Sequence, residues 1–450
     1  MSAPMPEGKV AAPPAPLMTE TRTAVVGALI VALGSVSMSL YTPAMPALVE
    51  AFQTTPATVK LTLTVYFGGF AFAQLVCGPL SDAFGRRPVA LGFFSVYLLG
   101  SVVAAVSPAI AWLVVGRMLQ GIGVAAGIAI SRAIVRDQFT GQQSARIMNL
   151  IGLMLTIGPA VSPALGGVIL GTVGWHAIFL VMVAYGLVVV LVLGFGVRET
   201  NRTPDPTRAR PGQIARNYLI LLRDRGFMRA GLLLGLMLGG IYTLAVLLPF
   251  VMIDRVGLTP TQFGLAMICQ TGSYMLGAAV TGRALRRMAA TRLIPLGVVL
   301  GVVAGLWLAI GLRLVRPSFV SVMGPVAIWA FGVALIMPGT TTSALAGFPM
   351  IAGAAAALTG FLQIGGGLAG SGVAAVFFRD PFVALTSVLP GMAALAALVH
   401  FALQPNPVRG RPTVAPEDFE AAIDPADLLG AGGEEIEAKL KGDNDPRDRS

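Results

Sequence analysis

The sequence predicts an all-α membrane protein with twelve transmembrane helices arranged in two halves of six. The composition is 55% hydrophobic and only 12% charged, and a soluble domain carries roughly twice that charged fraction. Twelve apolar windows reach the length of about twenty helical residues that is needed to cross about 30 Å of hydrocarbon. A polar, arginine-rich stretch, residues 198–228, separates the first six windows from the last six.

In chain order, we expect a disordered N-terminal tail over residues 1–22, which is too rich in proline for a helix or a signal peptide. Two six-helix bundles follow, at residues 23–197 and 229–403, joined by a cytoplasmic linker at 198–228. Acids outnumber bases in residues 404–450, which we expect to form an acidic cytoplasmic tail. The predicted spans are residues 23–45, 59–80, 89–107, 110–133, 143–171, 175–197, 229–253, 262–282, 292–312, 319–343, 350–377 and 381–403.

The distribution of arginine predicts the orientation of the chain, because cytoplasmic loops of membrane proteins carry an excess of basic residues. Arginines gather in the loops after the second, fourth, sixth and eighth spans, whereas the opposite loops carry few basic residues, Lys60 among them. We therefore expect both termini in the cytoplasm of a bacterial-type inner (plasma) membrane. The loop with Arg283, Arg286 and Arg287 weakly repeats the loop after the second span, which supports the division into halves.

Several classes of protein are disfavoured by the sequence. The net charge is +10, but the basic residues lie between apolar runs and form no single patch, which argues against nucleic acid as a partner. Cys77 and Cys269 both fall within predicted spans and are interpreted as small apolar residues. We find no metal-ligand spacing, nucleophile–base pair or phosphate-binding loop, so we expect no metal, no cofactor, no enzymatic activity and no use of ATP.

The most informative loop, residues 78–88, reads GPLSDAFGRRP. Its prolines and charges cannot continue a membrane helix, so it predicts a tight turn at the membrane surface. The loop resembles the pattern G-x-L-[AS]-D-R-x-G-R-[RK] between helices 2 and 3 of major facilitator superfamily transporters, with Ala83 in place of the usual basic residue. The resemblance implies the major facilitator fold and a role in a cytoplasmic gate, and the alternative is an ordinary cationic loop. The gate residues would be Gly78, Asp82, Gly85, Arg86 and Arg87.

An arginine lies inside the fourth predicted span, where a charge costs at least about 2.5 kcal/mol and is by default a functional residue. Arg117, Gln120 and Gly121 are three and four residues apart and therefore share one helix face. They resemble the R-x-x-Q-G-x-G motif on helix 4 of the same superfamily, which implies a role in proton or substrate coupling. The alternative is that Arg117 extends to the outer membrane interface.

The fifth predicted span is interrupted by prolines and glycines. Membrane helices tolerate proline as a kink, and small residues let a second helix approach closely. The run resembles the helix-5 signature of exporters in this superfamily, which implies antiport. Close packing of this helix is the alternative explanation, and the two are compatible. The residues concerned are Gly158, Pro159, Pro163, Gly166 and Gly167.

The end of the first span, residues 41–46, together with the fifth span and residues 353–363, resembles the bicyclomycin/chloramphenicol-resistance branch of drug–proton antiporters. That branch has an aspartate where this chain has Ser39, so the residue that would carry a proton is not identified. The other acids near the spans fall at predicted helix ends. A cavity with Arg117 and no acid should favour neutral or anionic substrates.

Polar and aromatic residues within the spans are candidates for lining a central cavity. Each has an alternative, because tyrosine and tryptophan also form interfacial belts and glutamine also bonds neighbouring helices. Besides Arg117 and Gln120, the candidates are Ser39, Tyr41, Tyr66, Tyr242, Gln270, Tyr274, Trp329 and Gln363.

Together these features predict a monomeric secondary transporter, surrounded by the lipid bilayer, that exports small drug-like neutral or anionic compounds. Its two halves would rock about a central site, and protons would be the coupling ion. An uptake facilitator or symporter on the same fold is the alternative, and a membrane receptor or enzyme has less support. The sequence does not specify the substrate.

Overall fold

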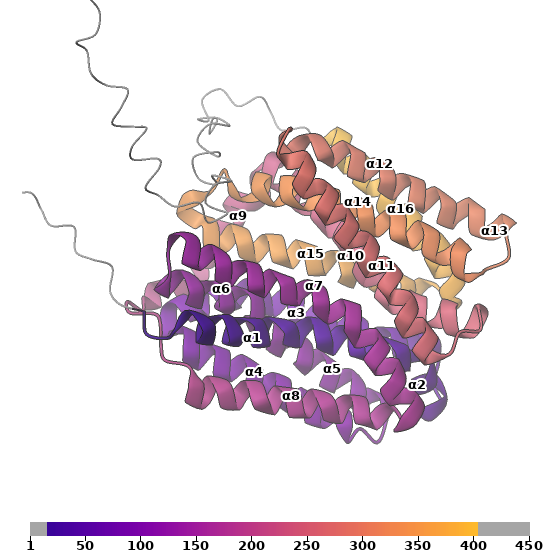
Figure 1. Ribbon diagram of the computed structural model, residues 1–450, viewed down its shortest axis with the longest axis horizontal. Coiled ribbons are helices and arrows are strands. Elements are labelled where there is room, and N and C mark those ends of the chain that lie inside the picture. The colour runs from indigo at the N-terminus through magenta and orange to yellow at the C-terminus, as the bar shows by residue number, and fades with distance from the viewer. Residues whose placement is uncertain (1–15, 404–450) are drawn as a thin grey trace, which may run out of the picture. The chain divides into compact units, whose positions relative to one another are not determined.

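The computed structural model describes residues 16–403 (Figure 1), so most of the predicted N-terminal tail and all of the predicted acidic tail lie outside the described residues. The described residues form helices and no strands. Twelve of the helical stretches are long and apolar enough to cross a membrane. This confirms the predicted fold class. All twelve belong to one compact unit of the chain.

Some spans are single helices and others are built from consecutive segments. In the first span, α1 (Glu20–Tyr41) continues through the short helix Thr42–Ala44 into α2 (Met45–Ala51). The fourth span joins α5 (Ile110–Val124) to α6 (Ala126–Gln138). The other helices of the first half are α3 (Pro56–Phe84), α4 (Arg86–Ala105), α7 (Gly141–Thr172) and α8 (Trp175–Gly196).

The linker contains a short 3₁₀ helix, Pro206–Ala209, and the α-helix α9 (Pro211–Arg223). The seventh span, which opens the second half, begins at Arg225, within the predicted linker at 198–228. In this half the seventh and ninth spans each contain a π-helical segment, Val251–Arg255 after α10 and Trp307–Gly311 after α12. The helices of the second half are α10 (Arg225–Phe250), α11 (Pro260–Leu285), α12 (Leu293–Leu306), α13 (Leu312–Leu314), α14 (Phe319–Leu345), α15 (Ala352–Phe377) and α16 (Pro381–Ala402).

Polar side chains mark where several spans begin. The side chain of Thr55 accepts a hydrogen bond from the backbone N–H of Thr58 at the start of α3. Thr259 and Gln262 form a reciprocal capping box at the start of α11. Such caps satisfy backbone donors that the helix itself leaves free, so they fix the residue at which each helix starts.

Two large apolar clusters form the core. One is centred in the first half and includes Phe250 and Ile364 of the second half, and the other surrounds Trp329 in the second half. The Trp329 side chain is fully buried, and its indole N–H donates to the carbonyl of Met237 at 2.8 Å. A Cβ atom on Gly240 would lie 2.4 Å from the indole ring, so this glycine lets α10 pack directly on it. Trp329 was predicted to line a cavity, and in this conformation its side chain offers no accessible surface.

The two halves meet along α3 with α15 and along α7 with α11. We call the two ends of the bundle the Asp82 end and the Lys60 end, after residues near the two ends of α3. Near the Lys60 end, a Cβ on Gly167 of α7 would lie 2.4 Å from the carbonyl oxygen of Pro260. Reciprocally, a Cβ on Gly264 of α11 would lie 2.3 Å from the carbonyl oxygen of Pro163. Only glycine allows the two backbones to approach so closely.

Towards the Asp82 end the same two helices separate, as Figure 1 shows for α7 and α11. A Cβ on Gly152 of α7 or on Gly282 of α11 would meet no atom within 4 Å. In this conformation the pair is therefore in contact at the Lys60 end and apart at the Asp82 end.

Substitution of Gly264 by leucine should force the Lys60 end open, because overpacking of a close contact costs about 1–3 kcal/mol. We expect labelling of a single cysteine at Thr64, which is buried between the halves, by a membrane-impermeant thiol reagent to accelerate roughly tenfold, the equivalent of about 1.4 kcal/mol. The control is Gly272→Leu on the same helix, where a Cβ would meet no atom within 4 Å. Equal labelling of both variants would contradict the assigned contact.

Candidate functional site

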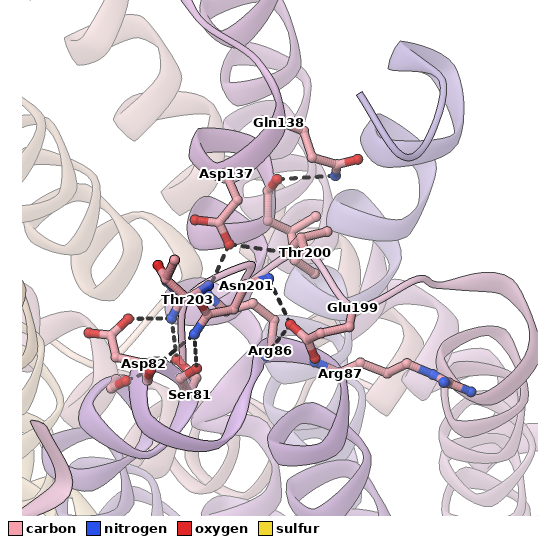
Figure 2. A network of polar contacts seen from close by, with 12 residues as sticks. Ser81, Asp82, Arg86, Arg87, Asp137, Gln138, Glu199, Thr200, Asn201 and Thr203 are labelled. Carbon is pink, nitrogen blue, oxygen red and sulfur yellow. Dashed lines mark hydrogen bonds and ion pairs between the residues drawn. The ribbon is translucent and has the colours of Figure 1, made fainter. Parts of the chain in front are cut away.

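The loop between α3 and α4 is held by a network of charged groups at the Asp82 end. Arg86 donates from Nε to Asp137 Oδ2 of α6 at 3.0 Å and from Nη1 to Ser81 Oγ at 2.9 Å, and it also pairs with Asp82 (Figure 2). The Arg86 side chain is only 11% exposed, so these charge-assisted bonds form away from bulk water and are stronger than surface pairs. The predicted extent of the turn is wrong, because α3 continues through Pro79 to Phe84 and only Gly85 separates it from α4. This short turn is bound to the end of the fourth span.

Glu199, which the sequence analysis did not single out, closes the same network from the end of the sixth span. Its carboxylate accepts the backbone N–H groups of Arg86 at 2.9 Å and Arg87 at 3.0 Å, the first two residues of α4. Carboxylates are stabilised at helix N-termini, where backbone donors are free and the helix dipole is positive. The sequence signal was an acid at the start of the linker, which composition alone could not pair with a helix 113 residues away.

Gly85 of the predicted motif has a double reason to be glycine. Its φ angle is +100°, a region that residues with a Cβ rarely adopt. A Cβ there would also lie 2.6 Å from the Glu199 carboxylate. Gly78, by contrast, has open space around its Cα hydrogen, so packing in this conformation does not require glycine there.

The linker continues the network. Asn201 Nδ2 donates to the carbonyl of Asp82 at 3.0 Å, the backbone N–H of Asp205 donates to the same carbonyl at 3.2 Å, and Thr200 Oγ1 donates to Asp137 at 3.1 Å. On the other side, Arg87 donates to the carbonyl of Leu193 at 3.2 Å near the end of α8. These bonds join the first half of the protein and the beginning of the linker into one body.

Arg117 lies between two tyrosine rings in the core of the first half. Its guanidinium carbon is 4.4 Å from the ring centroid of Tyr41 and 4.4 Å from that of Tyr66, and the residue is fully buried. Nη1 donates to Gln120 Oε1 at 2.6 Å and to the carbonyl of Ser37 at 3.4 Å. A desolvated cation between aromatic faces gains about 2 kcal/mol or more.

The charge on Arg117 nevertheless remains incompletely matched. Its Nε and Nη2 have no hydrogen-bond partner among residues 16–403. Arg117 also takes part in no ion pair among the same residues. The hydroxyl of Tyr97 is likewise buried and finds no hydrogen-bond partner in the described part of the chain. Buried donors without partners are costly and call for water, an anion or a change of conformation. The alternative of an arginine that extends to the interface finds no support in this full burial.

Gln120 and Gly121 have distinct packing roles beside Arg117. Gln120 Nε2 donates to Ser101 Oγ of α4 at 2.8 Å, which orients the amide so that its oxygen faces Arg117. A Cβ on Gly121 would lie 2.1 Å from the carbonyl oxygen of Tyr66. Glycine at this position therefore brings α5 against α3 and places the Tyr66 ring next to Arg117.

The proline–glycine run of the fifth span makes contacts on two sides. Gly158 and Gly166 face α1, where a Cβ would lie 2.7 Å from Ser35 Oγ and 2.2 Å from the carbonyl oxygen of Leu40, respectively. Gly167 faces α11 of the other half, as described above. Pro159 and Pro163 lie inside α7 without ending it. The run thus packs α7 onto α1 and, at the Lys60 end, onto the second half.

The span bounds place every acid of the twelve spans at or within two residues of a span end. These acids are Glu20, Glu50, Asp82, Asp137 and Asp254. Ser39, which occupies the position of the aspartate in the resembling branch, is 5% exposed. Among the described residues, Arg117 therefore shares the middle of the first half with no carboxylate.

The remaining cavity candidates differ in how far their side chains are buried. The Phe67 and Tyr242 rings, whose centroids are 5.4 Å apart, join α3 to α10 across the two halves. Tyr242, Tyr274 and Gln363 are partly exposed. Gln270 is 7% exposed, and its Oε1 has no partner in residues 16–403. Tyr41 and Tyr66 flank Arg117 and are buried.

Lys60 was counted with the loops in the sequence analysis, but the structure places it inside α3, fully buried. Its Nζ donates to the carbonyls of Ala374 at 2.7 Å and Phe378 at 2.9 Å, at the C-terminal end of α15. A cation is favoured there because the last carbonyls of a helix lack partners within it. Asp380, two residues after Phe378, pairs instead with Arg255. Lys60 thus bonds the first half to the second at the Lys60 end.

Comparison with known proteins gives consistent matches along the chain. The family model described as the Major Facilitator Superfamily matches residues 27–374. The uncharacterized MFS-type transporter YdgK of Bacillus subtilis is 30% identical over 334 residues, which cover 74% of this chain and 83% of that protein. The bicyclomycin resistance protein homolog of Haemophilus influenzae is 26% identical over 391 residues, which cover 85% of this chain and 97% of that protein.

The crystal structure of a D-xylose–proton symporter superposes with a TM-score of 0.66 at 16% identity. The superposition covers 86% of this chain and 98% of that chain. At this level of identity the match shows a shared fold alone.

Substitution of Lys60 by methionine should weaken closure of the Lys60 end, because it removes two hydrogen bonds from a charged donor, each worth about 1.5–3 kcal/mol. We expect a cysteine at Thr64 to react at least about tenfold faster with an impermeant thiol reagent, equivalent to about 1.4 kcal/mol. Lys60→Arg retains the charge and the donors and should react at a rate closer to that of the unsubstituted chain. Unchanged or slower labelling of Lys60→Met would show that the bonds do not hold this end closed.

Proposed function

Because the chain belongs to the Major Facilitator Superfamily, we propose that it is a secondary active exporter of small drug-like compounds that are neutral or anionic. It works by alternating access, with protons as the coupling ion and a monomer as the functional unit. It resides in the inner membrane of a bacterium with both termini in the cytoplasm.

The observation that carries the export proposal is the proline–glycine run of α7, residues 158–167. It resembles the helix-5 signature of antiporters, and Gly167 lies at the contact between the two halves. A relative that matches most of this chain is named a bicyclomycin resistance protein homolog, which supports drug-like compounds as the substrate class.

Alternating access requires that the two halves separate at one end while they close at the other. The contacts at Gly167, Gly264 and Lys60 hold the Lys60 end together, whereas α7 and α11 are apart at the Asp82 end. With the predicted orientation, the Lys60 end faces the outside and is closed in this conformation. The Asp82 end, where α7 and α11 are apart, would face the cytoplasm, from which a substrate for export would enter. Opening of the Lys60 end would transfer the Lys60 ammonium from two carbonyls to water.

The charge of the substrate is inferred from Arg117. Arg117 Nε and Nη2 lack hydrogen-bond partners among the described residues, and the first half has no acid at mid-span. This uncompensated positive charge disfavours a second cation nearby. Since Arg117 is fully buried, we assign it to the coupling step, in which a change of conformation or of local hydration would complete its hydrogen bonds. It need not touch the substrate in the conformation described.

An uptake facilitator or symporter is the second candidate function, and Ser39 is the observation that favours it. Without a carboxylate at this position, the spans of residues 16–403 have no acid at mid-span to carry a proton. A facilitator would then let transport follow the gradient of the substrate itself.

Directional flux in inverted membrane vesicles separates the two candidates. Accumulation of a substrate that depends on an inwardly acid pH gradient supports proton-coupled export. Equilibration that ignores the pH gradient supports a facilitator and contradicts the proposal. The substrate for this assay would come from a growth comparison of expressing and empty-vector cells over a panel of toxic compounds.

We expect Arg117→Ala to abolish transport or its pH dependence. A loss of at least about tenfold in flux corresponds to roughly 1.4 kcal/mol on the limiting step. Because removal of a packed side chain can also destabilise the fold, Arg117→Lys serves as a second variant that keeps the charge but not the planar fork. Flux and pH profile that stay unchanged in a well-expressed Arg117→Ala protein would remove Arg117 from the coupling step.

We expect Asp82→Asn to slow transport while the protein still inserts in the membrane, because the Arg86 guanidinium would lose one of its two carboxylate partners. A companion variant, Asp137→Asn, removes the other partner and should have an effect in the same direction. Flux equal to that of the unsubstituted protein, at equal expression, would contradict the gate assignment of Asp82.

A further inference from the structure

We propose that α9 of the linker is an interfacial helix that binds the headgroups of anionic phospholipids through Arg216 and Arg223. The inference concerns the membrane surface and does not depend on which solute is transported. It rests on three features of the described residues: a face by which α9 is fixed, an apolar face that is left uncovered, and an excess of positive charge.

One face of α9 is fixed to the bundle at the Asp82 end. Leu221 is fully buried in a cluster with Phe227 of α10 and Leu358 of α15. The Tyr218 hydroxyl donates to the carbonyl of Leu75 of α3 at 2.5 Å. Burial raises the pKa of Tyr218 to about 12, so the hydroxyl remains protonated and able to donate at neutral pH. The helix is therefore held in one rotational setting.

One side of α9, next to the face that is fixed to the bundle, exposes large aliphatic side chains. Leu219 and Leu222 are each 47% exposed, although α9 lies outside the twelve membrane spans. Leu219 and Leu222 are three residues apart and so are neighbours on the helix surface. Aliphatic side chains gathered on one face in this way mark a surface that a partner covers.

Arginines border the apolar face. Arg216 and Arg223 are exposed on the same side of α9, and Arg210 and Arg225 are exposed just beyond its two ends. The helix itself contains no acid. Apolar residues flanked by arginine on one helix face are typical of helices that lie in the membrane interface, where lipid tails cover the apolar residues and anionic headgroups pair with the cations.

The position of α9 in the chain supports the same partner. A single residue, Asp224, separates α9 from α10, which begins the seventh span. The side chain of Asp224 caps α10 by accepting the N–H of Phe227 at 2.8 Å. This short connection keeps the end of α9 within a few ångströms of the depth at which α10 enters the bilayer, so the membrane surface is the partner within reach.

The first test measures depth. A fluorescent label on a single cysteine at Leu219, in the full chain without its two native cysteines, is reconstituted in vesicles of phosphatidylcholine alone or with one quarter phosphatidylglycerol. We expect quenching by lipids with brominated tails in both, and at least about twofold stronger quenching with phosphatidylglycerol. The control label at Thr203, an exposed linker residue outside α9, should show weak quenching in both.

The second test removes the charge. Arg216→Gln with Arg223→Gln should abolish the extra quenching in anionic vesicles, since each arginine near an anionic surface strengthens attachment about fivefold. The matched control is Arg313→Gln with Arg316→Gln, two exposed arginines at the other end of the bundle, which should leave the quenching unchanged. Quenching that is equal in neutral and anionic vesicles, or insensitive to the α9 substitutions, would overturn the proposal.

Two other partners would also overturn it. If the label at Leu219 escapes lipid quenching and becomes accessible to aqueous iodide only after removal of residues 406–450, the acidic C-terminal segment covers α9. If its protection rises with the number of protein molecules per vesicle, a second copy covers the face. Transport flux, measured in parallel, separates these outcomes from failure of the proposed export function.

Discussion

The cost of placing a charge away from water is the constraint on which the rest of this structure depends. Among the described residues three cations are buried, and each meets this cost differently. Arg86 is paired with two carboxylates and Lys60 with two carbonyls at a helix end. Arg117 meets two aromatic rings, the Gln120 amide and the carbonyl of Ser37. The first two partner sets are complete enough to act as structural ties. The third leaves two nitrogens without partners, and this makes Arg117 the group most sensitive to a change in its surroundings.

Glycine determines where the helices can come close enough for these ties to form. Gly121 brings the backbone of α5 against α3 and so places the Tyr66 ring on Arg117. Gly167 and Gly264 bring α7 and α11 together at the Lys60 end, where Lys60 bonds the neighbouring pair α3 and α15. Without a strong hydrophobic force between helices inside a membrane, close packing and interhelical hydrogen bonds supply the contact between the halves. The contact between the halves at the Lys60 end is therefore confined to a few residues. Such a small contact can be broken in each transport cycle.

The fold followed from the sequence because span length and hydropathy are imposed by the bilayer, and the described residues contain the twelve spans that the apolar windows predicted. The face shared by Arg117, Gln120 and Gly121 also followed from helical spacing. The partners of these residues did not, because pairs such as Arg86 with Glu199 or Lys60 with Ala374 join positions separated by more than a hundred residues. No periodicity within a helix indicates such pairs. Lys60 was misplaced in a loop for the same reason, since a lysine near the start of a span looks like a boundary until its acceptors on another helix are known.

Glu199, Asn201 and Asp205 form hydrogen bonds to the end of α3 and the start of α4. These bonds define the last residues of the chain that are attached to the first half. The segment up to Asp205 is fastened to that half, whereas the side chain of Leu221 in α9 packs mainly with the second. A version of the protein expressed as two separate polypeptides should therefore be divided after the short helix Pro206–Ala209, which packs on α3, and before α9. A cut before Glu199 would leave α4 in the isolated first fragment without its carboxylate cap.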